Sequence, residues 1–552
     1  MAEKKVFARK ATGLVREIGM LTAVIIAMAN VVGLGWQKRV FQATGWTPIG
    51  ESKFFLGIHP VVMAFFLAGL VILISLYCFS MLSAAMPRSG GGYIFITRIL
   101  HPAVGFVATW FQFFAVAVSY GLIAVAVMEA VMIFGELAGI TQLGVWATPQ
   151  GLWIFGTLVV IVFSGIALFG VKMTGYLLQV IFWIPAAILV AVYILFLTAS
   201  PTTMEAGVQH LWGHSAAEYT QAALTQGMGD IAAGNTYWGA VFSAIVAAYW
   251  AYIGYAAASF VAGEVKEAHK TLPRAMFASG LAIIFLYITI STLMARAAMM
   301  VGRVGDFSLM SAMGFLNYGG GSFAEAGLPK IGGWMPMVAA MQAAGVGMTW
   351  LLPCIVFFAA LWVANDIPPF ILTTSRMIFA MAFDRLLPPK LADVNERWHS
   401  PWNAIIFTSV ITIVFGCTAE SGVLGAIWPG SFLARATSAL AIGVTDLWDV
   451  LFFGIVSIAA MLFPIMKPDI FERSPFRLSR TWTIVLGALA VLGNAFAFYV
   501  VSKAMNFFRD PMALLVSGLV LVSGIVIYWY YSNEARRTGV ELTTIFTEIP
   551  PD

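Results

Sequence analysis

The sequence predicts an all-helical integral membrane protein, and three observations lead to that fold class. Hydrophobic residues make up 61% of the 552 residues, and charged residues make up only 10%. The mean hydropathy of +0.90 lies far above the range of water-soluble domains. The third observation is a succession of apolar runs of about 20 residues, the length that a helix needs to cross the hydrocarbon core.

Twelve such runs follow one another, so we expect about twelve membrane-spanning helices. The eighth run is long and the ninth is short. The first run is too long for a cleavable signal peptide and has no small-residue cleavage site, so we expect it to remain as an anchor. The runs cover residues 18–43, 60–85, 102–135, 151–169, 175–199, 239–262, 275–301, 344–383, 404–418, 438–466, 482–501 and 511–531.

Positive charges indicate the orientation of the chain. Lys and Arg collect in the cytoplasmic loops of membrane proteins, and most of the 30 Lys and Arg residues lie on the side of the N-terminus. The polar stretch 201–237 has neither residue type and is expected outside. Both termini are therefore expected in the cytoplasm, and the net charge of +4 requires no nucleic-acid partner. The N-terminal cations include Lys4, Lys5, Arg9 and Lys10.

Two of the runs contain weak points, in the first and the sixth expected helices. An unpaired backbone group in hydrocarbon costs several kcal/mol, so an interruption survives only where it is buried in protein or lines a polar cavity. The paired interruptions predict a binding site near the middle of the membrane. The alternative is that their glycines only permit close helix packing. The predicted binding residues are Val32, Gly33, Leu34, Gly35, Trp250, Ala251, Tyr252, Ile253 and Gly254.

Four stretches between the runs resemble signatures of one known family. Residues 86–93 read Met-Pro-Arg-Ser-Gly-Gly-Gly-Tyr, which is similar to the Pro-Arg-Ser-Gly-Gly signature of the amino acid-polyamine-organocation (APC) permeases. The order of the four stretches and their spacing relative to the apolar runs agree with the family over nearly the whole chain. The other stretches are 263–275, 374–404 and 467–476.

The resemblance implies a fold of five plus five helices in inverted repeat, the LeuT-like arrangement, with the first and sixth helices broken. It implies a secondary active transporter for an amino acid or related amine in the cytoplasmic membrane, working by alternating access as a proton- or cation-coupled symporter or an exchanger. It does not imply an enzyme. The expected segments are an N-terminal segment 1–17, a first repeat 18–199, an extracellular loop 200–238, a second repeat 239–466, helices eleven and twelve in 467–532 and a cytoplasmic tail 533–552.

The two broken helices suit a zwitterion. Helix ends carry about half an elementary charge, so the start of the outer half-helix at Gly35 would attract a carboxylate. Free carbonyl groups near Ala251 and Tyr252 would attract an ammonium group. Trp250 is similar in position to the aromatic residue with which family members cover the substrate, and it is the expected gate. Leu34 departs from the small polar residue common between the glycines, so polar selectivity must come from elsewhere.

The eighth run carries Asp366 near its middle, followed by Pro368 and Pro369. Ten residues separate it from Arg376, about 15 Å along a helix, and a carboxylate at that depth costs at least about 2.5 kcal/mol. The prolines withdraw N–H groups and leave carbonyls near Asn365 free. We expect Asp366 and Asn365 to couple transport to H⁺ or to a cation such as Na⁺. The alternative is a structural carboxylate paired with Asn365 or with a neighbouring helix.

Two rival functions stay open. The same fold could carry an inorganic cation or a polyamine, which Asp366 favours, or the chain could be a channel or a membrane-embedded enzyme. Its six His and three Cys residues form no catalytic or metal-ligand pattern, and we expect neither a soluble cofactor nor a metal. Substrate identity and oligomeric state are not predicted. Five charged residues are expected at the outer interface, with the alternative that Lys38 and Arg39 draw in anionic substrates and that the three acidic residues form an entrance funnel. They are Lys38, Arg39, Glu129, Asp446 and Asp449.

Overall fold

A computed structural model describes residues 11–137, 140–441, 443–537 and 542–547 of the chain. The expected N-terminal segment 1–17 is described only from residue 11, so four of the expected cytoplasmic cations lie outside the described residues. The expected tail 533–552 is described only in part. The four cations are Lys4, Lys5, Arg9 and Lys10.

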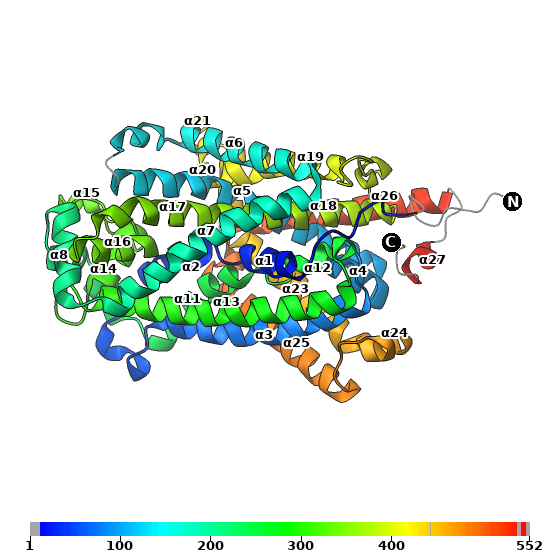
Figure 1. Cartoon of the computed structure of the whole chain (residues 1–552), viewed down its shortest axis with the longest axis horizontal. Helices are drawn as coiled ribbons and strands as arrows, with labels where there is room; N and C mark the ends of the chain where they lie inside the picture. The colour runs from blue at the N-terminus through cyan, green and yellow to red at the C-terminus, as the bar shows by residue number, and fades with distance from the viewer. Residues whose placement is uncertain (1–10, 138–139, 442, 538–541, 548–552) are drawn as a thin grey trace.

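The described residues form an all-helical bundle with no strand, and two isolated β-bridges link Ile18 to Val265 and Val304 to Phe307. Twelve helices within the described residues are long and apolar enough to cross a membrane, which confirms the predicted fold class. Most run along the long axis of the molecule (Figure 1). They are α1 (Met20–Ala29) with α2 (Leu34–Trp46), α3 (Pro60–Ala85), α5 (Pro102–Leu137), α6 (Pro149–Leu168), α7 (Gly170–Thr198), α11 (Tyr237–Tyr252) with α12 (Ala257–Phe260), α13 (Ala268–Met299), α17 (Leu352–Asn365) with α18 (Ile367–Phe383), α19 (Trp402–Ile411) with the π-helix η7 (Thr412–Cys417) and α20 (Thr418–Ser421), α23 (Val444–Met466), α25 (Arg480–Ala504) and α26 (Pro511–Arg537).

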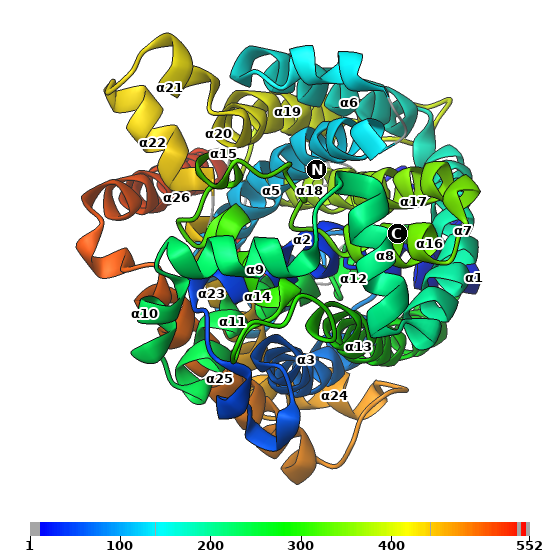
Figure 2. The ribbon, with the colours of Figure 1, turned by 90° about the vertical axis from the view of Figure 1, so that its left-hand side faces the viewer.

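Shorter helices cap the two ends of the bundle. Figures 1 and 2 show α8, α14, α15 and α16 together at one end, which we call the α8 end, and α4, α12 and α24 lie toward the other, the α4 end. The bounds are α4 (Gly92–Ile99), α8 (Pro201–Trp212), α9 (Ala216–Thr225), α10 (Met228–Ala233), α14 (Leu309–Tyr318), α15 (Phe323–Ala326), α16 (Met335–Gly345), α21 (Val423–Ile427), α22 (Phe432–Ala441), α24 (Pro468–Arg473), α27 (Leu542–Thr547), and the 3₁₀ turns η1 (Glu51–Lys53), η2 (Phe55–Gly57), η3 (Thr141–Trp146), η4 (Ala262–Glu264), η5 (Thr349–Leu351), η6 (Pro389–Ala392) and η8 (Phe507–Arg509).

The polar stretch 201–237, expected as an external loop, and a second polar stretch, 302–333, are largely helical. The segment 201–237 holds α8, α9 and α10, and 302–333 holds α14 and α15. A capping box starts each of the helices α8 and α9. At α8 the side chains of Ser200 and Thr203 accept from each other's backbone N–H groups, and at α9 those of Ser215 and Glu218 do the same. These motifs are readable in the sequence, and apolar periodicity alone missed them.

Burial separates central from peripheral spans. The apolar window of the sixth span is 89% buried in the protein, and the windows of the first, third and eighth are 72%, 78% and 78% buried. The fourth, fifth and twelfth windows are only 28%, 33% and 22% buried, so they are expected to face lipid. The first and sixth spans, where the breaks lie, therefore belong to the protein interior, the place where irregular backbone is tolerated in a membrane.

Three of the central spans are interrupted at mid-length. The first span loses its helix over residues 30–33 and the sixth over residues 253–256. Gly254 has φ +113°, a conformation that residues with a side chain rarely adopt. The eighth span is interrupted in its hydrogen bonding at Asp366, midway between its ends at Thr349 and Phe383, although the backbone of Asp366 keeps helical angles of φ −67° and ψ −28°. Two prolines follow that cannot donate to the preceding turn. The predicted breaks in the first and sixth helices are confirmed.

Candidate functional site

The breaks in the first and sixth spans meet at one hydroxyl group. Tyr287 of α13 donates to the backbone oxygen of Val31 and lies 3.0 Å from that of Ala251. One phenol proton thus links the two unwound segments. Asn30 packs on Gly254 so closely that a Cβ on this glycine would lie 2.1 Å from the Asn30 Nδ2. The two breaks therefore form a single unit in which glycine is required by contact as well as by conformation.

The first half-helix beyond the break packs tightly on the end of α11. A Cβ on Gly35 would lie 2.6 Å from the Cβ of Ala251 and 3.4 Å from the Trp250 ring. Close packing and a binding role for this glycine are thus compatible, because the same contact brings the start of α2 next to the Trp250 side chain.

A carboxylate from the eighth span lies against the start of α2. The Asp366 Oδ2 accepts a hydrogen bond from the backbone N–H of Leu34 at 3.4 Å. A Cβ on Gly33 would lie 1.9 Å from this Oδ2 and 2.1 Å from Oδ1, so only glycine leaves room for the carboxylate. Asp366 is 3% exposed, and none of the ion pairs found among the described residues includes it. Within the described residues, the one hydrogen bond of the Asp366 side chain is to a helix N-terminus.

Several buried atoms around Asp366 have no hydrogen-bond partner within the part of the chain that the structure describes. They are Oδ1 of Asp366, Asn365 and Asn30 and the hydroxyl of Ser119. A buried polar atom without a partner costs about 1–3 kcal/mol, so these groups are suited to bonding a ligand or water. Three of them line a cavity of about 10 Å³, close to the least volume that holds one water molecule. The structure is therefore a closed state of the site.

The cavity brings together part of the predicted set. Gly35, Trp250, Ala251 and Ile253 line it, together with Asp366. The binding roles of these residues stay predictions, because the geometry places them without a ligand.

Other predicted residues lie beside the cavity instead of facing it. Gly33 and Leu34 contact Asp366 as described, and Val32 is fully buried. The Tyr252 hydroxyl points away and donates to the backbone oxygen of Phe65 at 3.2 Å. Asn365 donates through Nδ2 to the Ala29 carbonyl at 3.4 Å.

Sequence reasoning missed four residues of the site. Tyr287 is one of 16 tyrosines in the chain and stands in an apolar helix with no motif around it. The others contribute apolar or backbone surface, which no composition signal distinguishes from packing. The cavity-lining residues that were missed are Val31, Ile123 and Phe370.

Charged residues close the site toward the α8 end. The guanidinium carbon of Arg39 lies 4.2 Å from the centroid of the Trp250 ring, a distance typical of a cation–π contact. Lys38 Nζ lies 2.9 Å from Glu129 Oε2 and 3.9 Å from Glu420 Oε1. These pairs lie one turn into α2, between the Asp366 cavity and a wider cavity of about 340 Å³ that Lys38 and Glu129 also line.

The expectation that these charges lie at the membrane interface is wrong. Arg39 is 6% exposed, and Asp446 and Asp449 of α23 are each 1% exposed. Lys38 and Glu129 retain 13% and 23% side-chain exposure but are bonded to each other. The reason is that α2, α5 and α23 lie inside the bundle, where their charged side chains cannot reach the headgroups.

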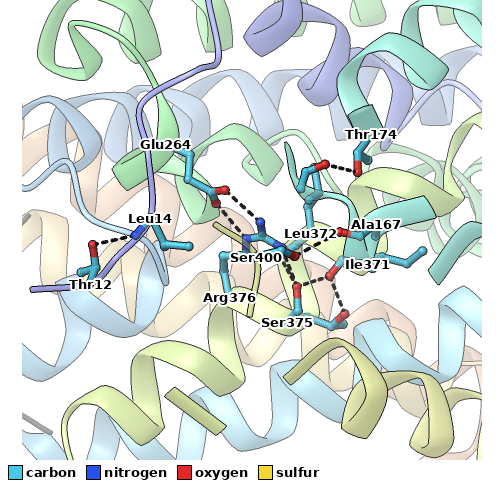
Figure 3. Close-up of polar contacts among 12 residues, drawn as sticks. Thr12, Leu14, Ala167, Thr174, Glu264, Ile371, Leu372, Ser375, Arg376 and Ser400 are labelled. Atoms are coloured by element: carbon cyan, nitrogen blue, oxygen red, sulfur yellow. Dashed lines mark hydrogen bonds and ion pairs between the residues drawn. The ribbon is translucent and has the colours of Figure 1, made fainter. Parts of the chain in front are cut away.

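Two buried ion pairs close the α4 end. Figure 3 shows the Arg376 guanidinium of α18 directed at Glu264, with distances of 2.8 Å from Nε to Oε1 and 2.9 Å from Nη2 to Oε2. Both side chains are 0% exposed. Arg98 of α4 binds Asp384 in the same bidentate manner, with 2.8 Å between Nη2 and Oδ1. Burial lowers the pKa of Arg98 and the charge of Asp384 raises it, with a net rise above the ordinary value.

The Glu264 backbone ties a further segment to this closure. Its carbonyl oxygen accepts from the N–H groups of Glu17 and Ile18, each at 2.9 Å, and Ile18 forms the isolated bridge with Val265. Residues just before α1 are therefore joined to the end of the sixth span. The sequence contained the signal for both ion pairs, since their residues stand inside or near the family-like stretches, but not which residue pairs with which.

Comparison with known proteins identifies the family of this bundle. The amino acid permease family matches residues 18–525 of the chain. The chain belongs to the amino acid permease family. The permease is 24% identical over 482 residues to the branched-chain amino acid permease BcaP of Lactococcus lactis, an alignment that covers 86% of this chain and 88% of that protein.

Two further relatives of the permease carry names of amino acid transporters. The serine/threonine exchanger SteT of Bacillus subtilis is 24% identical over 406 residues, covering 73% of this chain and 76% of its own. The human large neutral amino acids transporter small subunit 2 is 20% identical over 564 residues, covering 97% of this chain and 84% of its own. The resemblance inferred from the sequence motifs is thereby confirmed.

Proposed function

We propose that the permease is a secondary active transporter that moves a neutral amino acid across the cytoplasmic membrane by alternating access. The observation that carries this proposal is the cavity at the meeting point of three helix breaks, closed by charged residues toward both ends of the bundle. Such a carrier binds its substrate in the middle and opens one end at a time. A channel would need both ends open at once, and an enzyme would need reactive groups that face the cavity.

Neutral substrates fit the lining of the site. Apart from Asp366, the side chains that line the cavity are uncharged, and Ile123, Ile253, Phe370 and Trp250 are apolar or aromatic. An acidic or basic substrate side chain would need a further partner there. The named relatives carry branched-chain amino acids, large neutral amino acids or serine and threonine, which agrees with this proposal.

We further propose that the α4 end faces the cytoplasm and that segments 18–199 and 239–466 are the two inverted repeats. Each segment opens with a broken helix, and the excess of Lys and Arg in the loops supports the orientation. In this arrangement Trp250 is the gate on the outer side of the substrate, held by Arg39.

Uptake into proteoliposomes tests the proposal. Purified permease is reconstituted, and uptake of each radiolabelled proteinogenic amino acid is measured with an imposed pH gradient, with an imposed Na⁺ gradient, and after preloading with the unlabelled compound. Protein-free liposomes are the control. We expect uptake of one or a few neutral amino acids. Uptake of Rb⁺ or spermidine with no amino acid transported would contradict the proposal, and single-channel currents in a planar bilayer would replace it with a channel.

A further inference from the structure

The start of α2 already holds a carboxylate of the protein itself. The first N–H groups of a helix have no partner within it and attract anions. In the permease the Leu34 N–H, at the first position of this 13-residue helix, is bonded to the Asp366 Oδ2. The same carboxylate fills the space where Gly33 lacks a side chain. An amino acid that presents its own carboxylate to this half-helix meets Asp366 in the same place.

Two carboxylates about 3 Å apart cannot both be ionised. On this ground, and resting on the proposed function, we propose that an amino acid binds only when Asp366 carries a proton, so that one proton is transported with each amino acid. The neutral Asp366 then leaves the helix N-terminus to the substrate carboxylate and donates its own O–H within the site. When the α4 end opens to water, Asp366 loses the proton, and its charge expels the substrate carboxylate.

The groups packed around Asp366 leave the proton to it alone. Among the described residues of α1 and α12, none is ionisable, and on α13 the facing group is the Tyr287 phenol, whose proton is engaged with two carbonyls. The ionisable groups on the other contacting helices either have partners of their own or lie near the α4 end. Lys38 of α2 is paired with Glu129 of α5, and Arg39 of α2 lies over the Trp250 ring. The Tyr120 hydroxyl of α5 is hydrogen-bonded to Ser164, and Arg376 of α18 is paired with Glu264. On α7, Tyr193 is hydrogen-bonded to Thr289, and Lys172 and Tyr176 lie near the α4 end.

The geometry favours a proton over a metal cation. Asp366 Oδ2 faces an N–H group at the positive end of α2, and a cation brought to that oxygen would be repelled by the helix dipole. A proton on Oδ1, which has no partner among the described residues, meets no such repulsion. It also supplies a donor among neighbouring acceptor oxygens such as Asn30 Oδ1.

The experiment measures protons and amino acid in the same proteoliposomes. L-leucine and L-threonine are the probes, each radiolabelled, and a pH dye trapped inside reports proton entry. We expect about one proton per amino acid during net uptake. Binding affinity should also fall about tenfold for each pH unit above the point at which Asp366 ionises.

The variant Asp366→Asn copies the protonated side chain. It should retain counterflow of the amino acid, carry no protons and lose pH-driven accumulation. Asp449→Asn is the matched control, because Asp449 is also a buried carboxylate with an unpartnered oxygen but is not among the residues lining the cavity. The ratio of protons to amino acid transported by Asp449→Asn should stay at about one. The wild-type ratio stands as a test on its own if Asp366→Asn does not fold.

The other outcomes contradict either this inference alone or the proposed function as well. Leucine or threonine uptake with no protons would overturn this inference and leave amino acid transport standing. Uptake of the decarboxylated analogues isoamylamine or 1-amino-2-propanol, with no uptake of the amino acids, would overturn it as well, since Asp366 would then be a permanent partner for an amine. If the wild type transports neither these compounds nor any other neutral amino acid under any gradient, the proposed function itself fails.

Discussion

Replacing Glu264 by glutamine should open the α4 end of the permease. The Glu264–Arg376 pair is bidentate and both side chains are 0% exposed. Removing one partner of a buried pair leaves the other charge without compensation and costs about 3–5 kcal/mol. Glutamine keeps one hydrogen-bond acceptor, so we take the lower figure, which at 1.4 kcal/mol per factor of ten corresponds to about a 100-fold shift toward the open state.

Thiol labelling measures this shift. Ser259 of α12 lies in sequence between the helix break and Glu264 and is 0% exposed, so a cysteine there is protected while the end is closed. The three native cysteines are replaced first. In the Ser259→Cys background, Glu264→Gln should react with a membrane-impermeant thiol reagent about 100-fold faster than the parent. The native cysteines are Cys78, Cys354 and Cys417.

A second glutamate gives the control for charge removal. Glu472 pairs with Arg480, and their side chains are 57% and 55% exposed, so Glu472→Gln should change the labelling rate little. Equal labelling rates in Glu264→Gln and Glu472→Gln would refute the reasoning, because the buried pair would then contribute nothing to closure.

Three further predictions follow from single contacts. Gly33→Ala should abolish uptake, because the added Cβ would lie 1.9 Å from the Asp366 carboxylate. In the control Gly165→Ala no atom lies within 4 Å of the added Cβ, so uptake should be unchanged. Size-exclusion profiles show whether both variants fold. Trp250→Ala should release bound substrate toward the α8 end about tenfold faster, from the loss of about 1–2 kcal/mol of ring and cation contact; an unchanged efflux rate would exclude a gate. Burial lowers the pKa of His59 to about 4 from its ordinary 6.5. Below pH 6.5 the unfolded chain therefore binds a proton at His59 more readily than the folded protein, and the free energy of unfolding falls as the pH drops toward 4. The melting temperature of the wild type should drop more than that of His59→Asn between pH 7.5 and 4.5.

The sequence predicted the parts of the fold that depend on local pattern. Apolar length located the twelve spans, and glycines located the breaks at Gly33 and Gly254 because a conformational requirement belongs to a single residue. The depth of Asp366 also followed from counting residues along one helix. Each of these inferences needs only the rise of a helix and the chemistry of its own residues.

Contacts between distant segments could not be predicted in this way. Leu34 and Asp366 are separated by 332 positions, and Arg98 and Asp384 by 286. Which charge meets which depends on the order in which helices pack, and a hydrophobic helix looks alike in sequence whether it faces lipid or protein. The same ambiguity placed Lys38 and Arg39 at the interface when they lie inside the bundle.

The two closures differ in strength, and this difference indicates the direction in which the carrier opens. At the α4 end, Glu264–Arg376 and Arg98–Asp384 are bidentate pairs with no side chain more than 2% exposed, so separating them leaves four buried charges to be hydrated. At the α8 end, Lys38 lies 2.9 Å from Glu129 and 3.9 Å from Glu420, and the side-chain exposures of the three residues are 13%, 23% and 16%. The wider cavity already lies beside Lys38 and Glu129. Partly hydrated pairs contribute less to closure than desolvated ones. The α8 end is therefore the easier one to open. In the proposed transport cycle, a substrate that enters there with a proton on Asp366 must supply the binding energy that separates the pairs at the α4 end.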